Sequence, residues 1–248
     1  MNNKTMINND NKMIPWELLQ KKMTWQQLSF IHNKKVLDFG SGIGITANHF
    51  AADNEVVAIE PSDDMLNSKV QDNEYLQIKG SLDELEKIED NYFDVILCHN
   101  VLEYAEERIN IVKEFARILK DGGTLSVLKH NRNGRIMQMV VLLNNFEHAN
   151  DLLDGKCGHA EKFGAINYYD DEDIVKWSGV FSIKEIHGIR TFFDLQQNQD
   201  IQKDIEWQEK MLSIETKVCD IDEFKAIACF HHIILHKNNI QQLKDIKS

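Results

Sequence analysis

Short apolar runs alternate with polar segments of helical character through the first half of the chain. Strands are predicted over residues 34–39, 55–60, 75–79, 93–99 and 124–130. These runs are too apolar for a sheet with one face in water, which favours parallel strands covered on both faces. The helical segments between them supply right-handed crossovers, so the pattern predicts an α/β fold built on a doubly wound sheet.

The alternation of predicted strands and helices ends after His130. Residues 131–168 contain a Met- and Leu-rich helical stretch, Ile136–Phe146, and are predicted to form a cap insertion. Two further strands are expected at residues 181–192 and 226–237. We therefore expect an N-terminal helical cap segment over residues 1–33 and a main domain over residues 34–248.

A glycine-rich turn follows the first strand, in the sequence VLDFGSGIGITA (36–47). Gly40, Gly42 and Gly44 allow positive φ angles and let a ligand lie against bare backbone. The helix that follows directs its N–H groups at the same place. The turn therefore predicts a binding loop at the carboxyl end of the first strand.

The residues around this loop restrict the class of ligand that it can bind. A dinucleotide fingerprint needs glycine where Ile45 stands, which disfavours a nicotinamide-dependent dehydrogenase. Asp38 places a carboxylate beneath the loop, where it suits an ammonium group better than a phosphate. Glu60 ends the second strand, where doubly wound folds place an acid for ribose hydroxyls. An amino-acid–nucleoside fits this set best.

Four segments carry a resemblance to a known family: VLDFGSGIG, VVAIEPSDDML, FDVILCHNVLEY and LKDGGTLSV. Over about residues 34–130 the chain resembles the class I S-adenosylmethionine-dependent methyltransferases, especially the type 11 group. The resemblance implies a Rossmann-like methyltransferase fold with a mostly parallel seven-stranded sheet, and S-adenosyl-L-methionine as cofactor. It implies these cofactor-binding residues: Asp38, Gly40, Ser41, Gly42, Gly44, Glu60, Pro61, Met65, Ser81, Leu82 and His99.

Individual roles follow from the same resemblance. Gly40, Ser41 and Gly42 would line the methionine part, with Asp38 reaching its amino group through water. Glu60 would hold the ribose, Ser81 and Leu82 would flank the adenine, and His99 would face the sulfonium.

A fainter resemblance covers the whole chain. Residues 16–28, 131–149 and 188–194 are similar to the bacterial methyltransferases that esterify carboxymethoxyuridine at the tRNA wobble position. That family often has an arginine that contacts the cofactor carboxylate, and Gln20 occupies the matching position here. The family's C-terminal Glu-Pro-Tyr segment is replaced by CDIDEFKAI (219–227).

Methyl transfer demands alignment more than acid–base chemistry. A carboxylate acceptor needs no base, whereas a phenol, amine or hydroxyl could use His99 or His130. The sequence CFHH (229–232) suggests metal at first sight. Neighbouring strand residues point to opposite faces, however, so His231 and His232 cannot easily share one ion. We expect no metal site.

The amino-acid composition bears on the choice of methyl acceptor and on the cellular compartment. The formal net charge is −12, which opposes a broad RNA-binding face. The four cysteines form no CxxC pair, no apolar run is long enough to cross a membrane, and no apolar leader is present, so a cytoplasmic protein without a membrane partner is expected. A small-molecule acceptor is our first hypothesis. Esterification of a tRNA nucleoside and a non-catalytic cofactor-binding protein are the alternatives.

Overall fold

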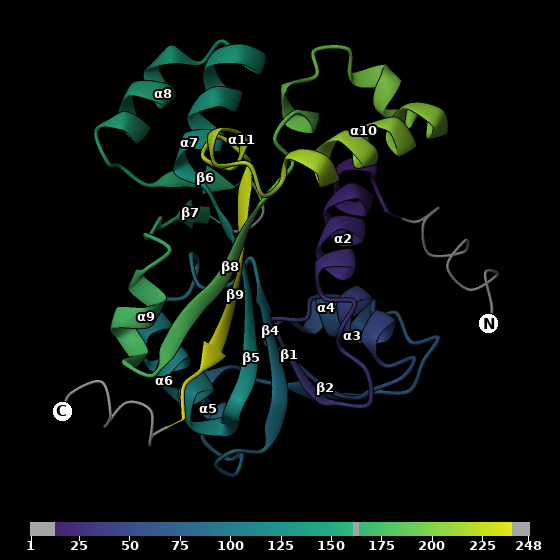
Figure 1. Ribbon diagram of the computed structural model, residues 1–248, viewed down its shortest axis with the longest axis vertical. Helices are drawn as coiled ribbons and strands as arrows, with labels where there is room; N and C mark the ends of the chain where they lie inside the picture. The colour runs from purple at the N-terminus through teal and green to yellow at the C-terminus, as the bar shows by residue number, and fades with distance from the viewer. Residues whose placement is uncertain (1–12, 161–163, 240–248) are drawn as a thin grey trace. The chain divides into compact units, whose positions relative to one another are not determined.

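The computed structural model describes residues 13–160 and 164–239, and its centre is a seven-stranded sheet (Figure 1). The strands are β1 (Lys35–Phe39), β2 (Glu55–Glu60), β3 (Leu76–Lys79), β4 (Phe93–His99), β5 (Leu119–His130), β8 (Phe181–Ile189) and β9 (Phe230–Lys237). They lie in the order β3-β2-β1-β4-β5-β9-β8, and β1–β2, β1–β4, β2–β3 and β4–β5 pair in parallel. The predicted α/β class and mostly parallel sheet are confirmed.

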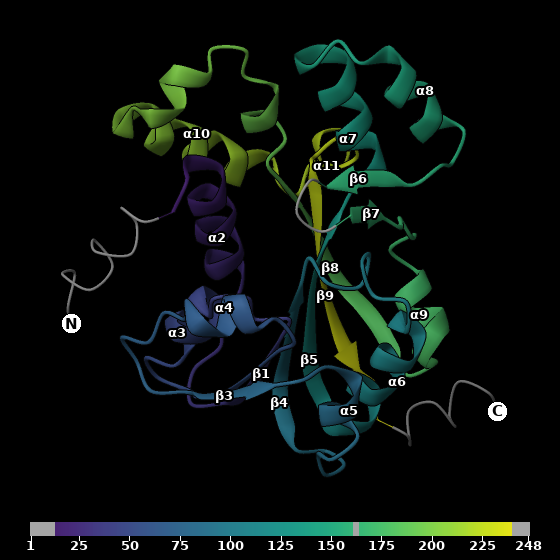
Figure 2. The same ribbon diagram turned by 180° about the vertical axis from the view of Figure 1, so that it is seen from behind.

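Helices cover both faces of this sheet, as Figures 1 and 2 show. On one side lie α3 (Ile45–Phe50) and α4 (Asp63–Asn67); on the other lie α5 (Leu82–Leu85), α6 (Arg108–Ile118) and α9 (Asp173–Ser178). Phe39 of β1 packs edge-on against Phe115 of α6, with ring centroids 5.3 Å apart. Both rings are buried, and such burial of large apolar side chains is the main favourable term in folding.

The chain divides into two compact units. Among the described residues, the sheet unit comprises Ile31–Lys129, Tyr169–Ile186 and the chain from Ile233 onward. The helical unit comprises the chain up to Phe30, together with His130–Tyr168 and His187–His232. Three of the five boundaries fall within strands β5, β8 and β9, and each unit is assembled from three separate pieces of sequence.

The helical unit contains most of the remaining elements. They are α2 (Pro15–Gln27), α7 (Arg132–Met137), the π-helix η1 (Gln138–Leu142), α8 (Phe146–Leu153), β6 (Gly158–Ala160), β7 (Gly164–Ile166), the 3₁₀ helices η2 (Phe193–Leu195) and η3 (Gln199–Lys203), α10 (Ile205–Val218) and α11 (Asp222–Lys225). Strands β6 and β7 pair antiparallel as a separate two-stranded sheet. No helix among the described residues is long and apolar enough to span a lipid bilayer.

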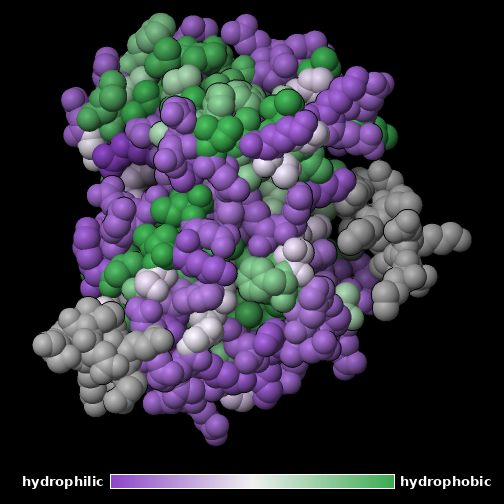
Figure 3. Space-filling view, viewed as in Figure 1, coloured by the Kyte–Doolittle hydropathy of each residue, from purple (hydrophilic) through white to green (hydrophobic). Residues whose placement is uncertain are grey.

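The Met- and Leu-rich stretch of the cap has one buried and one exposed side. Met139 packs with Ala149 and Leu152 in a small core. Val140, Leu143 and Phe146 are exposed, and Figure 3 shows apolar side chains gathered over α7 and α8. The predicted helical stretch over residues 136–146 is helical up to Leu142, through the end of α7 and the π-helix η1, and is then interrupted until α8 begins at Phe146.

Two further boundaries differ from prediction. The fifth strand, predicted over residues 124–130, begins at Leu119, so Asp121 to Gly123 lie inside β5. Gly122 has a φ of 73°, and the β4–β5 pairing shifts register beside it, so the strand absorbs the turn as an irregularity. The last strand begins at Phe230 instead of residue 226, because α11 and a helical bond from Ala228 N–H to the Lys225 carbonyl occupy the preceding residues.

Candidate functional site

The predicted binding residues of the sheet unit gather at the carboxyl ends of its parallel strands. The strand order reverses between β1 and β4, which is where open α/β sheets place ligands. Asp38 of β1 is in register with Leu97 of β4, and Glu60 of β2 is in register with Lys79 of β3. The polar strand ends therefore share one edge of the sheet.

The glycine loop crosses the end of β2. The backbone N–H groups of Gly40 and Ser41 both donate to the Ile59 carbonyl, at 2.8 and 3.1 Å. Gly40, Gly42 and Gly44 all have positive φ, as the glycine spacing predicted. A side chain at Gly40 would collide with Val101, whereas no atom lies within 4 Å of a Cβ built on Gly42. The loop is therefore tight on one side and open at Gly42.

Glu60 is the central acid of the site. Its Oε2 accepts the Gly42 N–H at 2.8 Å and its Oε1 accepts the Ser62 N–H at 2.9 Å. The side chain is thus held in place by the loop on one side and by the start of α4 on the other. A carboxylate oxygen accepts more than one hydrogen bond, so Glu60 keeps acceptor capacity for a ligand.

Asp38 is buried at the end of β1, 3% exposed. Its charge acts on its neighbours: burial, with the Asp38 carboxylate second, raises the pKa of Tyr75 to about 12. Burial and the charges of Glu103 and Asp38 also raise the pKa of the Cys98 thiol. The local field therefore favours a cation, and Cys98 stays a neutral, buried thiol.

Sequence analysis did not single out Gln77 of β3. Its Nε2 donates to the Ser41 hydroxyl at 3.0 Å, while its Oε1 is buried and has no hydrogen-bond partner among the described residues. That Oε1 also lies 3.6 Å from a Cβ built on Gly44. A buried acceptor left without a donor is costly, so Gln77 is a candidate ligand-binding residue. Its position depends on strand pairing, which gives no local signal.

The segments after β2 and β3 carry the other predicted cofactor residues. Pro61 leads into α4, whose N-cap Ser62 accepts the Met65 N–H at 3.5 Å. Gly80 N–H donates to the Glu60 carbonyl at 3.2 Å, which brings Ser81 and Leu82 beside the end of β2. The Ser81 hydroxyl does not cap α5, and its N–H donates instead to Asp83 at 2.9 Å.

His99 ends β4, and its Nε2 lies 2.9 Å from the Ser126 hydroxyl of β5. Ser126 is fully buried, so this contact fixes the plane of the imidazole. The next residue, Asn100, has a φ of 58°, a left-handed conformation that asparagine tolerates better than most residues. Its Oδ1 is buried with no hydrogen-bond partner among the described residues, which makes it a second candidate missed by sequence analysis.

Two predicted site residues belong to the helical unit. Gln20 is buried in α2, and its Oε1 accepts from Arg190 Nη1 at 3.1 Å. His130 follows β5, and its ring lies 4.5 Å from that of Phe230, between centroids. Their predicted roles toward the cofactor and the acceptor stay predictions, because they lie in a different unit from the other predicted residues.

Comparison with known proteins points to one reaction class. Residues 37–127 match the family model of the methyltransferase domain. The chain is 24% identical to the tRNA 5-carboxymethoxyuridine methyltransferase of Escherichia coli K12, covering 88% of each chain. It is 27% identical to the ubiquinone biosynthesis O-methyltransferase of Escherichia coli O9:H4 (strain HS), covering 63% of this chain and 65% of that one.

A solved structure agrees in fold. One chain of the complex between the Haloferax volcanii Trm112 methyltransferase activator and its partner methyltransferase superposes with a TM-score of 0.60. The match covers 93% of both chains at 14% identity, which supports the fold alone.

Proposed function

We propose a small-molecule methyl acceptor for this chain, which belongs to the class I S-adenosylmethionine-dependent methyltransferases. The loop at the carboxyl ends of β1 and β2 fits the cofactor. Gly42 opens onto free space, Gln77 offers a buried acceptor atom, and Asp38 provides the negative field that an amino group needs. In this proposal Glu60 holds the ribose hydroxyls.

When bound, S-adenosylmethionine supplies a methyl group on a positively charged sulfur, which an acceptor lone pair displaces in line. The work left to the protein is alignment, worth roughly 7–11 kcal/mol of the barrier in favourable cases. In this proposal S-adenosylmethionine is held by the glycine loop, Glu60, Ser81 and Leu82. Asn100, next to His99, orients the methyl acceptor in this proposal.

His99 acts in this proposal as general base for a phenol, hydroxyl or amine acceptor. In this proposal the Ser126 hydroxyl, 2.9 Å from His99 Nε2, orients the ring. On taking the acceptor proton, His99 would become an imidazolium. His99 is thus the catalytic residue and Ser126 the positioning residue of the proposed reaction.

Charge on the protein supports a small acceptor over a polyanion. Four lysines of the helical unit form ion pairs with neighbouring carboxylates: Lys156–Asp151, Lys203–Asp200, Lys210–Glu206 and Lys225–Asp222, at 2.6–2.9 Å. RNA affinity depends on cations that replace the counterions of phosphates. Lysines already paired with carboxylates contribute little to such binding.

The tRNA nucleoside is the second candidate. It is favoured by the E. coli tRNA methyltransferase, whose match extends over 88% of both chains, whereas the ubiquinone enzyme matches a smaller part. A carboxylate acceptor would need no base, so this reaction would not depend on His99. The two candidates therefore differ in both substrate and mechanism.

We further propose a reducing compartment, the cytoplasm, for this reaction. None of the four cysteines forms a disulfide, and Cys98, Cys219 and Cys229 are buried. Disulfides are rare where thiols are kept reduced, so this pattern is typical of cytoplasmic proteins.

The test uses methyl-labelled S-adenosylmethionine with two fractions of host extract, total tRNA and deproteinised small molecules. Label confined to the small-molecule fraction is the expected result. Label in tRNA that is released by mild alkali would mean a methyl ester and would replace our proposal with the second candidate. Activity on tRNA should fall steeply with rising salt, whereas activity on a small molecule should change little.

A further inference from the structure

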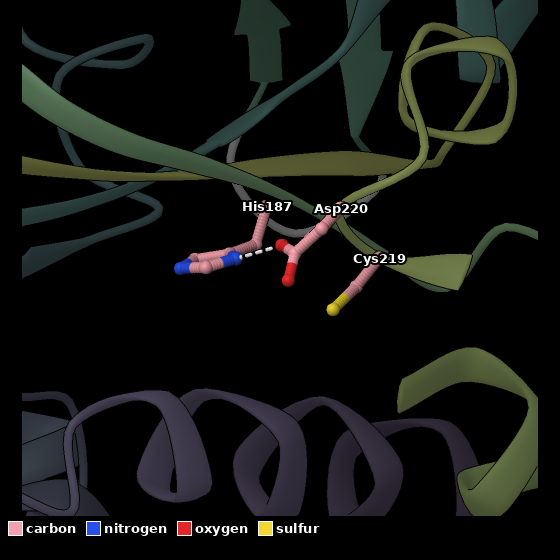
Figure 4. Close-up of side chains that lie close together, drawn as sticks. All are labelled: His187, Cys219 and Asp220. Carbon is pink, nitrogen blue, oxygen red and sulfur yellow. Dashed lines mark hydrogen bonds and ion pairs between the residues drawn. The ribbon is translucent and has the colours of Figure 1, made fainter. Parts of the chain in front are cut away.

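Three side chains of the helical unit meet outside the proposed methyl-transfer site (Figure 4). They are His187 of β8, Cys219 at the C-terminal end of α10, and the adjacent Asp220. One ligand atom from each lies within 4.8 Å of the other two. His187 Nδ1 is hydrogen-bonded to the Asp220 carboxylate. An imidazole nitrogen, a thiol sulfur and a carboxylate oxygen thus lie close together.

Backbone contacts hold the cluster together. The Gly188 N–H donates to the Cys219 carbonyl at 2.7 Å, so β8 and the end of α10 are tied between His187 and Asp220. A Cβ on Gly188 would lie 3.0 Å from Lys225 Cα and from the Ala228 side chain, so this close approach requires glycine. The three ligands are therefore positioned by the fold before any ion arrives.

The cluster combines enclosure with an open side. Cys219 is 5% exposed and the His187 side chain 11%, whereas the Asp220 side chain is 69% exposed. In Figure 4 the side chains project toward α2. Asp220 therefore gives an ion access from solvent, while His187 and Cys219 hold it inside the fold.

We propose that His187, Cys219 and Asp220 bind one zinc ion. Nitrogen, sulfur and oxygen ligands together suit zinc, which in protein sites is commonly tetrahedral. Three protein ligands leave the fourth position for water. On binding, the S–H bond of Cys219 breaks, sulfur bonds to zinc and the proton passes to solvent. His187 binds through Nδ1 and carries its remaining proton on Nε2.

The other histidines nearby have different hydrogen-bond partners. His231 Nε2 lies 3.1 Å from the Lys225 carbonyl, and His232 Nδ1 lies 2.7 Å from Gln27 Oε1. The cluster that does form joins His187 to residues 219 and 220, a pairing that sequence spacing could not reveal.

The main experiment titrates the full, untagged chain with Co²⁺, a spectroscopic substitute for zinc. We expect one equivalent to give strong tetrahedral d–d bands and a thiolate-to-metal charge-transfer band, both removed by added Zn²⁺. Cys219→Ser should abolish the charge-transfer band, and His187→Ala or Asp220→Asn should weaken binding at least tenfold. The matched control, Cys157→Ser, removes an exposed cysteine and should change nothing.

A second measurement needs no variant and so does not depend on a variant's folding. In the wild-type chain, Zn²⁺ should slow alkylation of Cys219 at least tenfold, read by peptide mass spectrometry, and leave Cys157 unchanged. Equal alkylation rates of Cys219 with and without Zn²⁺ would overturn the proposal. A cobalt spectrum without a thiolate band, or one lost in Cys157→Ser, would do the same.

Discussion

Two buried glutamates, one in each unit, accept hydrogen bonds from backbone N–H groups, but their surroundings give them different roles. Glu60 in the sheet unit accepts two backbone N–H groups, from Gly42 and Ser62. Glu215 in the helical unit accepts three, from Thr191, Phe192 and Phe193, at 2.7–2.9 Å. Both carboxylates therefore fix a turn that follows a strand.

Their surroundings differ. Glu215 is completely buried, and burial raises its pKa despite the three N–H groups that act in the opposite direction. Glu60 adjoins Gly42, where the structure leaves open space. A carboxylate enclosed by its own chain stabilises the fold, whereas one that borders open space is available to a ligand. Substitutions should separate these two roles.

The largest effect is expected from Glu215→Ala. It leaves three buried N–H groups without an acceptor, each costing about 1–3 kcal/mol, so the free energy of unfolding should fall by roughly 3–9 kcal/mol. Urea denaturation of this variant beside Glu209→Ala, an exposed glutamate of the same helix, measures the difference. Equal stability of the two variants would mean that Glu215 does not hold the turn.

The helical unit should also make stability depend on pH. Burial, with the charge of His187 second, lowers the pKa of His232 from 6.5 to about 3. Between these pH values His232 binds a proton in the unfolded chain but not in the folded chain. The stability present above about pH 6.5 is therefore lost as pH falls toward 3. At about 1.4 kcal/mol per pH unit, the loss is roughly 4 kcal/mol over this window.

His232→Gln should flatten that dependence, measured as the free energy of unfolding between pH 7 and pH 4. His159→Gln, on the exposed strand β6, serves as the control and should keep the wild-type slope. An unchanged slope in His232→Gln would remove this residue as the cause.

In the sheet unit, His99→Gln should lower kcat about a hundred- to a thousandfold on a phenol, hydroxyl or amine acceptor, the usual range for losing a general base. The loss should shrink as pH rises, because the acceptor then ionises without help. Ser126→Ala should give a smaller fall in kcat. Cofactor affinity should stay unchanged in Ser126→Ala. A carboxylate acceptor would show no dependence on His99.

Local patterns were enough to predict the frame of the proposed site. Positive φ angles at Gly40 and Gly42 were predictable because glycine adopts them readily. The position of Glu60 at the end of β2 was predictable from the apolar run that precedes it. Contacts between distant segments were not predictable. Gln77 meets Ser41, and His187 meets Asp220, only because strands pair and helices pack in three dimensions. Periodicity along a single chain does not encode such register.

The central claim is that the carboxyl ends of β1 and β2 bind S-adenosylmethionine through Glu60. Titration calorimetry with S-adenosylhomocysteine tests it on the wild type, on Glu60→Ala and on Glu55→Ala, an exposed glutamate at the start of the same strand. Charged hydrogen bonds to two ribose hydroxyls predict about a hundredfold weaker binding in Glu60→Ala and no change in Glu55→Ala. Wild-type protein that does not bind, or Glu60→Ala that binds as the wild type does, would contradict it.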